Sequence, residues 1–568
     1  MAALDRHGIL PAMPESAPLV SSSRPEHIFP ALSAEQIARV AAHGKTRQGK
    51  RGEVLVEPGD RKVPFFVITS GTVEIVRLFG AAETLVVVHE PGQFTGEINM
   101  LSGRPSLIRA RFGEPGSVIE LDHDELLTLV QNDSELGEIF LRAFILRRVE
   151  LLAQGLGDVV LIGSMHCSGT LRIQEFLTRN GHPYAFIDLD HEDDVQQLLD
   201  RFHVAFADIP VLICRGELVL RNPSNEKIAG CLGFNESIDP SKIRDLVVIG
   251  AGPAGLAAAV YGASEGLEVL VLETNAPGGQ AGSSSKIENY LGFPTGISGQ
   301  ELAGRAYTQS QKFGAELMVA TSAKHLSCER KPYALELGDG TRVLARSVII
   351  ASGAEYRRPD LENLSRFEGS GIYYGATFIE AKLCDDDEVI VVGGGNSAGQ
   401  AAVFLARTAR KVYMLVRSAG LAESMSRYLI RRIEDSPKIE LRTRTEIVGL
   451  EGGQRLERVQ MKDHETGEVE AHDIGHVFLM TGAVPSTEWL DGCVARDAKG
   501  FIKTGTNLSP DDLLTARWPL ARPPHLLETN LPGVFAVGDV RSGSIKRVAS
   551  AVGEGSIAVS FVHQVLHE

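Results

Sequence analysis

Two glycine-rich segments, each directly after an apolar run, constrain the fold of this chain more than any other feature. Residues 246–255 are L-V-V-I-G-A-G-P-A-G, and residues 389–398 are V-I-V-V-G-G-G-N-S-A. Each β-branched run predicts a buried strand, and the alanine-rich stretch after each G-x-G-x-x-G/A motif predicts a helix. A strand, a glycine turn and a helix N-terminus together predict a dinucleotide site, because the first helix amides face a pyrophosphate.

The spacing within each motif assigns a role to each small residue. In the first, Gly250 permits the turn, Gly252 lets the backbone approach phosphate, and Gly255 lets helix and strand pack closely. The first motif also includes Pro253 and Ala254, and the candidate binding residues of the second are Gly393, Gly395, Asn396, Ser397 and Ala398. Two such sites predict two dinucleotides in one catalytic unit. A flavin and a nicotinamide are the natural pair, because hydride passes between them.

The residue ending the next apolar run distinguishes the two sites. Glu273 ends the run E-V-L-V-L-E, where a carboxylate can accept hydrogen bonds from adenosine ribose hydroxyls. The equivalent strand after the second motif ends in Arg417, which suits a ribose 2′-phosphate. The sequence therefore predicts FAD at the first site and NADPH at the second. The alternative for Arg417 is a solvated residue at a strand end, which leaves NADH possible.

Residues 241–568 resemble the low-molecular-weight thioredoxin reductase family of FAD/NADPH enzymes. The motifs that carry the resemblance are G-G-Q-A at 278–281, I-E-N-Y-L-G-F-P at 287–294, A-S-G-A at 351–354, M-T-G-A-V-P at 480–485, G-V-F-A-V-G-D-V at 533–540 and K-R-V-A-S-A-V-G-E-G at 546–555. The resemblance implies that Asp539 contacts the flavin ribityl chain, and that Gly279, Gln280 and Asn289 approach the FAD. It also implies an NADPH domain inserted into a split FAD domain.

This chain departs from the family where the family carries the redox pair C-A-T-C. Residues 375–378 here are Gly-Ala-Thr-Phe, so both redox cysteines are absent. A disulfide is an efficient acceptor of flavin electrons, and this route is closed at that position. Cys384 lies six residues after Phe378 and is predicted to be a small buried hydrophobe. The family's His-Arg-Arg contact for the 2′-phosphate is reduced to Val-Arg-Ser around Arg417.

An N-terminal region resembles the cyclic nucleotide-binding domain, because short strands separated by glycines predict a β-barrel or jelly roll. The segment 96–106, G-E-I-N-M-L-S-G-R-P-S, is similar to the family's phosphate-binding cassette, and Glu97 takes the place of its ribose ligand. The phosphate-binding arginine is replaced by Ser106, with Arg104 and Arg109 nearby but out of register. We therefore predict weak or no binding of cyclic nucleotides. The domain is then a structural or regulatory barrel with an inactive pocket, and the alternative is a barrel that binds a cyclic nucleotide.

The middle region resembles a thioredoxin/glutaredoxin module, since strand, helix, strand, acidic helix and strand follow in order. Cys167 precedes the first predicted helix, where the N-terminus favours a thiolate, and His166 stands beside it. The resemblance places the cis-proline of the family at Pro210. The motif is Cys-Ser-Gly-Thr, so Cys167 lacks a resolving partner. It is either a redox thiol or part of a module that keeps only the fold.

Composition limits the remaining possibilities. The chain has 568 residues, too many for one core, and a net charge of −16, which argues against nucleic acid as a partner. We expect no signal peptide, no membrane span, no metal site and a cytoplasmic location. Six scattered cysteines without C-x-x-C predict neither a disulfide framework nor a zinc ribbon. An apolar helix at 136–152 predicts a homodimer, because helices of this kind often dimerise in the cyclic nucleotide-binding family.

The expected architecture is multidomain α/β: a β-barrel or jelly roll, a thioredoxin-like module, and two Rossmann-like domains with one inserted in the other. The predicted boundaries are 1–25 for a disordered tail, 26–152 for the cyclic nucleotide-binding-like domain, 157–236 for the thioredoxin-like module, 241–358 and 481–568 for the FAD domain, and 359–480 for the NAD(P)H domain. The leading hypothesis is hydride transfer from NADPH to FAD and on to an unidentified acceptor. The alternatives are a thiol reductase using Cys167, and a regulatory sensor with little turnover.

Overall fold

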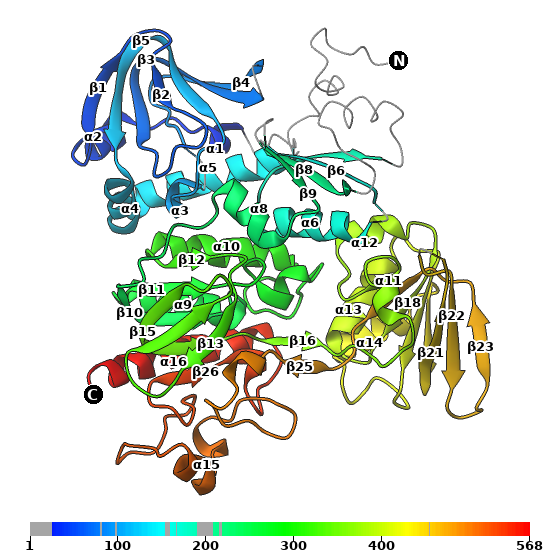
Figure 1. Cartoon of the computed structure of the whole chain (residues 1–568). Helices are drawn as coiled ribbons and strands as arrows, with labels where there is room; N and C mark the ends of the chain where they lie inside the picture. The colour runs from blue at the N-terminus through cyan, green and yellow to red at the C-terminus, as the bar shows by residue number, and fades with distance from the viewer. Residues whose placement is uncertain are drawn as a thin grey trace, which may run out of the picture. The chain divides into compact units, whose positions relative to one another are not determined.

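The computed structural model describes residues 25–79, 82–96, 99–153, 159–165, 167–189, 208–214, 218–453 and 455–568. Almost all of the predicted tail, as well as Glu97 and His166, lies outside this part of the chain. The chain divides into two compact units. One contains residues 1–165, 176–236 and 311–313, and the other contains residues 166–175, 237–310 and 314–568 (Figure 1).

The first unit begins with an antiparallel β-domain, as its alternating strands predict. Its sheet has the order β1-β5-β3-β4, and β2 pairs with β5 (Figure 1). The elements are α1 (Pro25–Ile28), α2 (Ala34–Ala41), β1 (Lys45–Gly49), β2 (Val54–Val56), β3 (Phe65–Phe79), β4 (Ala82–His89), α3 (Asn99–Ser102), β5 (Arg109–Leu121), α4 (His123–Asn132) and α5 (Ser134–Ala153). Buried phenylalanine rings join strand and helix, because Phe140 of α5 lies 4.8 Å from both Phe65 and Phe94 between ring centroids. The long helix predicted at 136–152 therefore packs on the barrel.

A small mixed sheet of order β7-β6-β8-β9 follows the β-domain. The elements of this segment are β6 (Val159–Gly163), α6 (Ser168–Arg179), β7 (Ala185–Asp188), β8 (Val211–Cys214), β9 (Leu218–Arg221) and α8 (Asn225–Leu232). β6 and β7 are parallel, whereas β8 runs antiparallel to both β6 and β9. The peptide bond between Ile209 and Pro210, before β8, is cis, and the assignment of this segment to a thioredoxin-like module stays a prediction. The predicted acidic helix falls in 190–207, outside the described residues.

The second unit contains the first nucleotide-binding sheet, of order β12-β11-β10-β15-β14-β13, with β26 paired to β15. Its elements are β10 (Ile243–Ile249), α9 (Pro253–Ser264), β11 (Val269–Leu272), α10 (Gly299–Lys312), β12 (Glu316–Met318), β13 (Ala323–Ser327), β14 (Tyr333–Leu337), β15 (Arg342–Ile350), β26 (Val534–Ala536) and α16 (Val548–Leu566). β10 pairs in parallel with β11 and β15, and its apolar residues 246–249 are buried on both faces of the sheet. This explains the continuous apolar run before Gly250.

The second nucleotide-binding sheet is parallel throughout, in the order β17-β24-β18-β19-β20. Its elements are β17 (Ile372–Tyr373), α12 (Phe378–Leu383), β18 (Glu388–Val392), α13 (Asn396–Leu405), β19 (Lys411–Val416), α14 (Arg427–Glu434), β20 (Ile439–Thr443) and β24 (His476–Leu479). An antiparallel sheet of β21 (Thr445–Glu451), β22 (Arg458–Asp463) and β23 (Val469–His472) accompanies it. The chain enters and leaves through β16 (Ala354–Tyr356) and β25 (Ala483–Pro485), an antiparallel pair. The second domain is therefore an insertion, as predicted.

One disulfide corrects the expectation drawn from cysteine spacing. Cys328, directly after β13, is bonded to Cys493, although the two are 165 residues apart in sequence. Both border the same apolar core, on one face of the first sheet. The inserted domain separates them along the chain while the sheet brings them together, so sequence spacing gave no sign of the pair. No helix among the described residues is long and apolar enough to cross a membrane.

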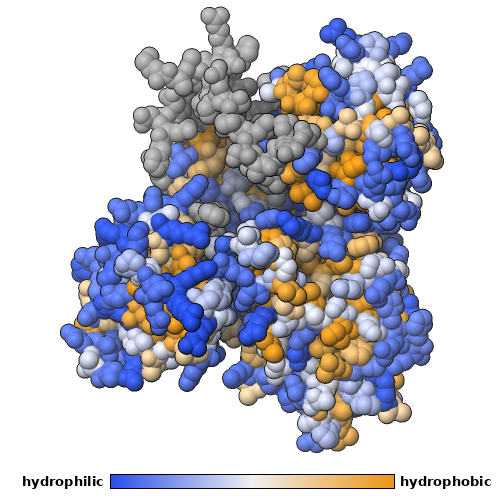
Figure 2. Space-filling model, turned by 180° about the vertical axis from the view of Figure 1, so that it is seen from behind, coloured by the Kyte–Doolittle hydropathy of each residue, from blue (hydrophilic) through white to orange (hydrophobic). Residues whose placement is uncertain are grey.

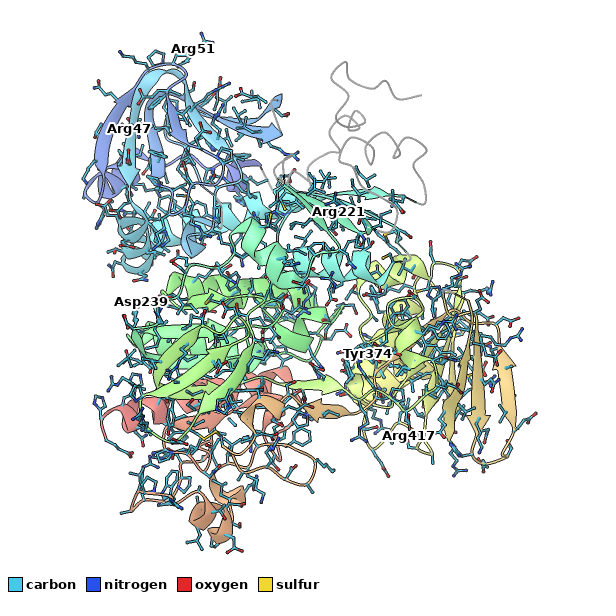
Figure 3. The ribbon with its side chains drawn as sticks, in the orientation of Figure 1. Arg47, Arg51, Arg221, Asp239, Tyr374 and Arg417 are labelled. Carbon is cyan, nitrogen blue, oxygen red and sulfur yellow. A yellow bond between two sulfur atoms is a disulfide. The ribbon has the colours of Figure 1, made fainter. Side chains whose placement is uncertain are left out.

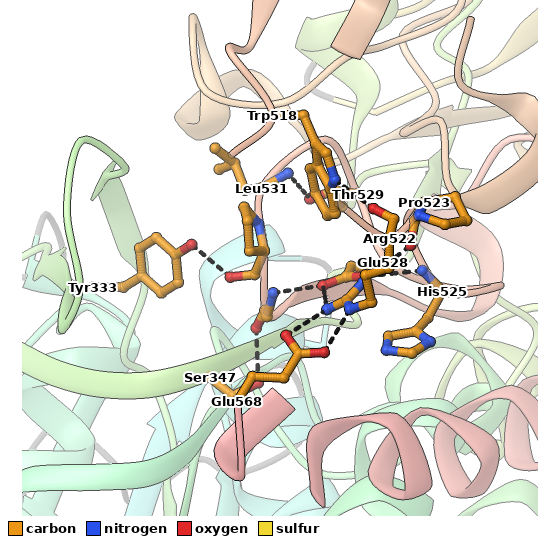
Figure 4. A network of polar contacts seen from close by, with 12 residues as sticks. Tyr333, Ser347, Trp518, Arg522, Pro523, His525, Glu528, Thr529, Leu531 and Glu568 are labelled. Atoms are coloured by element: carbon orange, nitrogen blue, oxygen red, sulfur yellow. Dashed lines mark hydrogen bonds and ion pairs between the residues drawn. The ribbon is translucent and has the colours of Figure 1, made fainter. Parts of the chain in front are cut away.

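A buried carboxylate connects the C-terminal residues to the first sheet (Figure 4). Glu528 is fully buried and accepts hydrogen bonds from the backbone N–H groups of Gly533 and His525, both at 2.8 Å. Its ion pair with Arg522 measures 2.6 Å, and Arg522 also pairs with the more exposed Glu568 at 2.5 Å. Every acceptor position of Glu528 is therefore used within the protein.

Replacing Glu528 by glutamine is expected to destabilise the protein by about 2–3 kcal/mol, because a donating amide replaces an oxygen that accepts from donors. Chemical denaturation followed by circular dichroism measures this change in the free energy of unfolding. Glu568→Gln is the matched control and should cost less than about 1 kcal/mol, since that carboxylate is partly exposed. Equal losses in the two variants would contradict the role assigned to burial.

Candidate functional site

The first glycine loop lies at the carboxyl edge of the first sheet. Ile249, the last residue of β10, pairs with Leu272 on one side and with Ile350 on the other. The carboxyl ends of three parallel strands are therefore level, and the loop after β10 leads directly into α9. Ligands of open α/β sheets bind at this edge.

Each glycine of the first loop has a separate structural reason. Gly250 has φ +101°, and a Cβ there would lie 2.3 Å from the carbonyl oxygen of Ala351. A Cβ on Gly255 would lie 1.8 Å from the carbonyl oxygen of Gly250, so only glycine allows this close approach. A Cβ on Gly252 would instead meet only the Cα of Gly279, at 3.9 Å. The fold itself therefore leaves room for a side chain at position 252. Glycine is needed there only if a phosphate approaches the backbone.

The N-terminus of α9 is arranged for an anion. Gly252 is the N-cap residue and has no side chain to cap the helix, Pro253 begins the helix, and Ala254 follows. A helix of this length presents its first amide groups and its positive dipole end to the space in front of Gly252. The residues therefore fit the pyrophosphate of FAD at the predicted position.

Glu273 follows β11 at the same edge and is 7% exposed. Its Oε2 accepts a hydrogen bond from the Ala251 N–H at 2.7 Å, and its Oε1 accepts one from the Asn275 N–H at 2.9 Å. The carboxylate therefore holds the glycine loop to the segment that follows β11. Sequence reasoning missed this bracing role, because the motif assigns Glu273 only to the ribose.

The Gly-Gly-Gln segment packs directly against the loop. The N–H of Gly278 donates to the carbonyl oxygen of Ala251 at 2.7 Å, and a Cβ on Gly279 would lie 2.9 Å from the Cα of Gly252. The side chain of Gln280 donates to the carbonyl oxygen of Ala354 at 2.5 Å. This segment therefore borders the space in front of Gly252. Asn289 is exposed, further along the same stretch.

Asp539 lies in a short turn that follows β26. A Cβ on the preceding Gly538 would lie 3.1 Å from the Cβ of Ala254, so this turn is adjacent to the start of α9. Burial raises the pKa of the Asp539 carboxyl, while the charge of Lys546 opposes the shift. The Gly538 N–H donates to Glu554 of α16 at 2.7 Å. The turn is therefore held in place by a carboxylate that the sequence motifs did not single out.

The second glycine loop repeats the first on the inserted sheet. Gly393 has φ +141°, and a Cβ there would lie 2.4 Å from the carbonyl oxygen of Met480. A Cβ on Gly395 would meet nothing within 4 Å, so this position is also open. Ala398, in the third small-residue position, is fully buried. The same combination of one strained, one open and one packed position therefore fits a second dinucleotide.

The residues that open α13 have different surroundings. The side-chain oxygen of Asn396 accepts a hydrogen bond from the N–H of Ser426, before α14, at 2.7 Å. Ser397 is exposed at the helix start. Asn396 thereby joins two helices, a structural role that the motif alone did not indicate.

Arg417 is the first residue after β19 and is exposed (Figure 3). Its strand is level with β18, because Val392 pairs with Leu415, so Arg417 lies at the same edge as Gly393. The neighbouring Ser418 hydroxyl donates to the carbonyl oxygen of Gly420 at 2.7 Å and closes the turn. An exposed guanidinium at this edge can reach a ribose 2′-phosphate.

The segment 375–378 leads into α12, which begins at Phe378. Thr377 and Glu380 cap this helix, since the Thr377 N–H donates to the Glu380 carboxylate at 2.8 Å. Cys384 is fully buried, its thiol donates to the carbonyl oxygen of Glu380 at 3.2 Å, and burial raises its pKa to about 12. Cys384 is thus a packing residue, in agreement with the sequence prediction.

Cys167 directly precedes α6 and is half-buried, with its carbonyl oxygen accepting the Leu171 N–H at 3.1 Å. It therefore occupies the cap position of a twelve-residue helix. Its partial exposure leaves the thiol accessible to a reaction partner.

Three residues in or near the cassette segment bear on phosphate binding, and all three are engaged within the protein. The Ser106 hydroxyl donates to the carbonyl oxygen of Ile108 at 2.9 Å. Arg109 pairs with Glu57 at 2.9 Å and with Glu83 at 2.6 Å. Arg104 is 6% exposed, and its guanidinium lies 4.4 Å from the ring centroid of Phe234. Both arginines are therefore engaged by other residues of the chain, and weak binding of cyclic nucleotides stays a prediction. Glu97 lies outside the described residues.

Comparison with known proteins identifies the class. Residues 244–555 match the family model described as pyridine nucleotide-disulphide oxidoreductase, and residues 46–133 match the cyclic nucleotide-binding domain. The chain therefore belongs to the pyridine nucleotide-disulphide oxidoreductase family, with a cyclic nucleotide-binding domain fused at its N-terminal side. It is an enzyme of the FAD- and NADPH-dependent type.

Within this family the similarity is to thioredoxin reductases. The chain is 31% identical to that of Ureaplasma parvum, over 57% of this chain and 97% of the relative, and 31% identical to that of Bacillus subtilis, over 58% and 96%. The Lactococcus lactis thioredoxin reductase structure matches with a TM-score of 0.51 at 28% identity, over 57% of this chain and 100% of that chain. The T. acidophilum enzyme matches with a TM-score of 0.51 at 27% identity, over 58% and 100%. The resemblance drawn from the motifs is confirmed.

Proposed function

We propose that this protein transfers electrons from NADPH through FAD directly to a small-molecule acceptor such as a quinone, without a redox pair of cysteines. The observation that carries the proposal is the segment 375–378, Gly-Ala-Thr-Phe, at the position where thioredoxin reductases carry that pair. The nearest thiol along the chain, Cys384, is fully buried and has a raised pKa, so it forms little thiolate. This leaves the flavin itself as the electron donor at this site.

The proposed roles of the residues follow from their positions. When bound, FAD would accept a hydride from NADPH and pass two electrons to the acceptor. Gly252 and the start of α9 hold the FAD pyrophosphate, and Asp539 orients the flavin chain. Gly395 and Arg417 hold NADPH. The reaction balances as NADPH, one proton and a quinone giving NADP⁺ and a hydroquinone.

We predict that Cys167→Ser keeps the NADPH oxidation rate of the wild type, within about twofold, when a water-soluble quinone is the acceptor. Direct transfer from flavin to quinone needs no thiol, so the change should leave it unaffected. Steady-state NADPH consumption by the purified holoprotein measures the rate. Cys231→Ser is the matched control, because Cys231 is a partly exposed thiol in α8.

The opposite result would favour a thiol reductase. If Cys167→Ser abolishes NADPH oxidation with every acceptor while FAD stays bound, Cys167 carries the electrons and the proposal is wrong. Even under that alternative, a single thiol stays trapped as a mixed disulfide unless a second thiol releases it. We therefore expect slow reduction of thioredoxin at best. Anaerobic titration with NADPH excludes the remaining alternative, a sensor, if the flavin is bleached within seconds.

We further propose that the protein works as a homodimer in the cytoplasm with no nucleic-acid partner. The net charge of −16 opposes binding to phosphate backbones. Light scattering during size-exclusion chromatography measures the mass, and a monomer at micromolar concentration would contradict the dimer.

A further inference from the structure

A cavity of about 230 Å³ lies within the N-terminal β-domain. Its wall includes Gly96, Met100 and Ser106 of the cassette segment, so it coincides with the place where a cyclic nucleotide would be expected. Most of the remaining wall is apolar. It includes Val56, Val63, Ile75, Val87, Ile108 and Ala110. An engineered apolar cavity of about 150 Å³ stays dry and binds benzene, so this cavity has room for two fused rings.

The cavity is unsuited to a phosphate. Arg104 and Arg147 both line it, but both are engaged by other residues. The Arg104 guanidinium donates to the carbonyl oxygen of Asn180 at 3.2 Å and lies 4.4 Å from the ring centroid of Phe234. The Arg147 guanidinium donates to the carbonyl oxygens of Ile28 at 2.9 Å and Gly96 at 2.7 Å. The same guanidinium lies 4.8 Å from the ring centroid of Phe94, which holds it in place. Glu150 also lines the cavity. A buried phosphate would therefore lose its hydration without gaining the arginine fork that replaces it.

One buried polar group in the wall can select a ligand. His89, at the end of β4, is 2% exposed, and its Nδ1 has no hydrogen-bond partner among the described residues. Burial and the charge of Arg147 lower the pKa of His89 to about 3, so the imidazole is neutral at physiological pH. The imidazole also hydrogen-bonds to the Gln93 side chain, so Nδ1 is the nitrogen that can pair with a single polar group of a ligand.

We propose that this cavity binds a small uncharged aromatic molecule of about two fused rings that carries one hydroxyl or carbonyl group, with His89 as its hydrogen-bond partner. The apolar wall supplies the affinity through burial of the rings. The His89 nitrogen supplies the preference for one polar group, because leaving it buried without a partner is unfavourable. This site is separate from the two dinucleotide sites, and the proposal does not depend on the electron acceptor.

Strand β4 carries part of the cavity wall and also exposes hydrophobic side chains to the surface. Figure 2 shows a hydrophobic patch on the N-terminal β-domain, and β4 exposes Leu85 at 57% and Val88 at 39%. A bulge in the pairing of β3 with β4 at Val86 lets Val86 and Val87 both line the cavity. Val88 therefore provides an outward-facing control for changes at Val87.

The first test compares three ligands on the intact FAD-loaded protein by isothermal titration calorimetry. We expect 2-naphthol to bind at a single saturable site in the β-domain, at least about tenfold more tightly than naphthalene-2-sulfonate, since the sulfonate charge cannot be paired there. Cyclic AMP should neither bind measurably nor displace 2-naphthol. Absence of 2-naphthol binding, or tighter binding of cyclic AMP or of the sulfonate, would overturn the proposal.

Two variants locate the site. Val87→Trp should fill the cavity and abolish 2-naphthol binding, whereas Val88→Trp, one residue along, should bind as the wild type does. His89→Phe keeps an aromatic ring but removes the nitrogen, so it should weaken 2-naphthol by roughly threefold to tenfold and leave naphthalene unchanged. Equal binding by Val87→Trp and wild type places the ligand elsewhere and overturns the proposal. Thermal melting of each variant establishes whether it is folded. If Val87→Trp does not fold, the binding of 2-naphthol and naphthalene to His89→Phe decides whether the ligand occupies this cavity.

Discussion

Replacing Gly252 by valine is expected to give a folded but colourless protein. A Cβ at this position meets only the Cα of Gly279, at 3.9 Å, so the first atom of the new side chain fits the fold. The valine side chain nevertheless projects into the space where the FAD pyrophosphate approaches the helix amides. We expect flavin occupancy of the purified protein to fall at least about tenfold, because the lost phosphate contacts weaken FAD binding. The ratio of visible flavin absorbance to protein absorbance measures it.

Gly304→Val is the matched control. Gly304 is exposed in α10 of the same domain, and a Cβ there meets no atom within 4 Å. This variant carries the same chemical change and should purify yellow. Near-ultraviolet circular dichroism shows whether Gly252→Val retains its tertiary packing. Full flavin occupancy in Gly252→Val would show that the FAD site is wrongly assigned.

Replacing Arg417 by alanine is expected to weaken NADPH binding by about tenfold to a hundredfold while changing NADH binding little. The guanidinium lies at the carboxyl edge of the inserted sheet, where it can make a charge-assisted contact with the 2′-phosphate that only NADPH carries. Loss of such a contact costs roughly 1.5–3 kcal/mol. Steady-state KM values for the two nucleotides, measured with the same quinone, report the difference.

Arg410→Ala separates this effect from a general loss of positive charge. Arg410 directly precedes β19, so it lies at the opposite end of the strand that Arg417 follows. It is exposed and forms only a long ion pair with Glu388, at 3.7 Å. Its removal should leave the preference for NADPH intact. Equal losses of NADPH and NADH in Arg417→Ala would show that Arg417 is merely a solvated strand-end residue.

The parts of the fold that follow from local patterns could be predicted from the sequence. The runs before Gly250 and Gly393 are β-branched and continuous because both strands are buried in parallel sheets. The conformations of these glycines follow from the turn that joins strand to helix. The insertion of one domain into another followed from motif order, through the resemblance to thioredoxin reductases. In each case neighbouring residues carry the signal.

The features that were missed depend on residues far apart in the chain. Glu273 braces the Ala251 amide, and Cys328 bonds to Cys493 across the inserted domain. Arg104 was noted only as a possible phosphate ligand, yet it is buried against Phe234. Such contacts form when the tertiary structure closes, and a single sequence contains no periodic or spacing signal for them. The ligand roles of Asn289, Asp539 and Arg417 stay predictions.

The pairing of β15 with β26 has a consequence for biosynthesis. Ile350 ends β15, but its partner Ala536 is translated only after the whole inserted domain. At typical rates of about 5–20 residues per second, the edge of β15 waits roughly ten to forty seconds on the ribosome. An unpaired strand edge can pair with another chain. The inserted domain contains all the strands of its own sheet, so it can fold while the first sheet is still incomplete. Ribosome-bound chains that stop before β26 should therefore expose an open sheet edge for chaperones to cover.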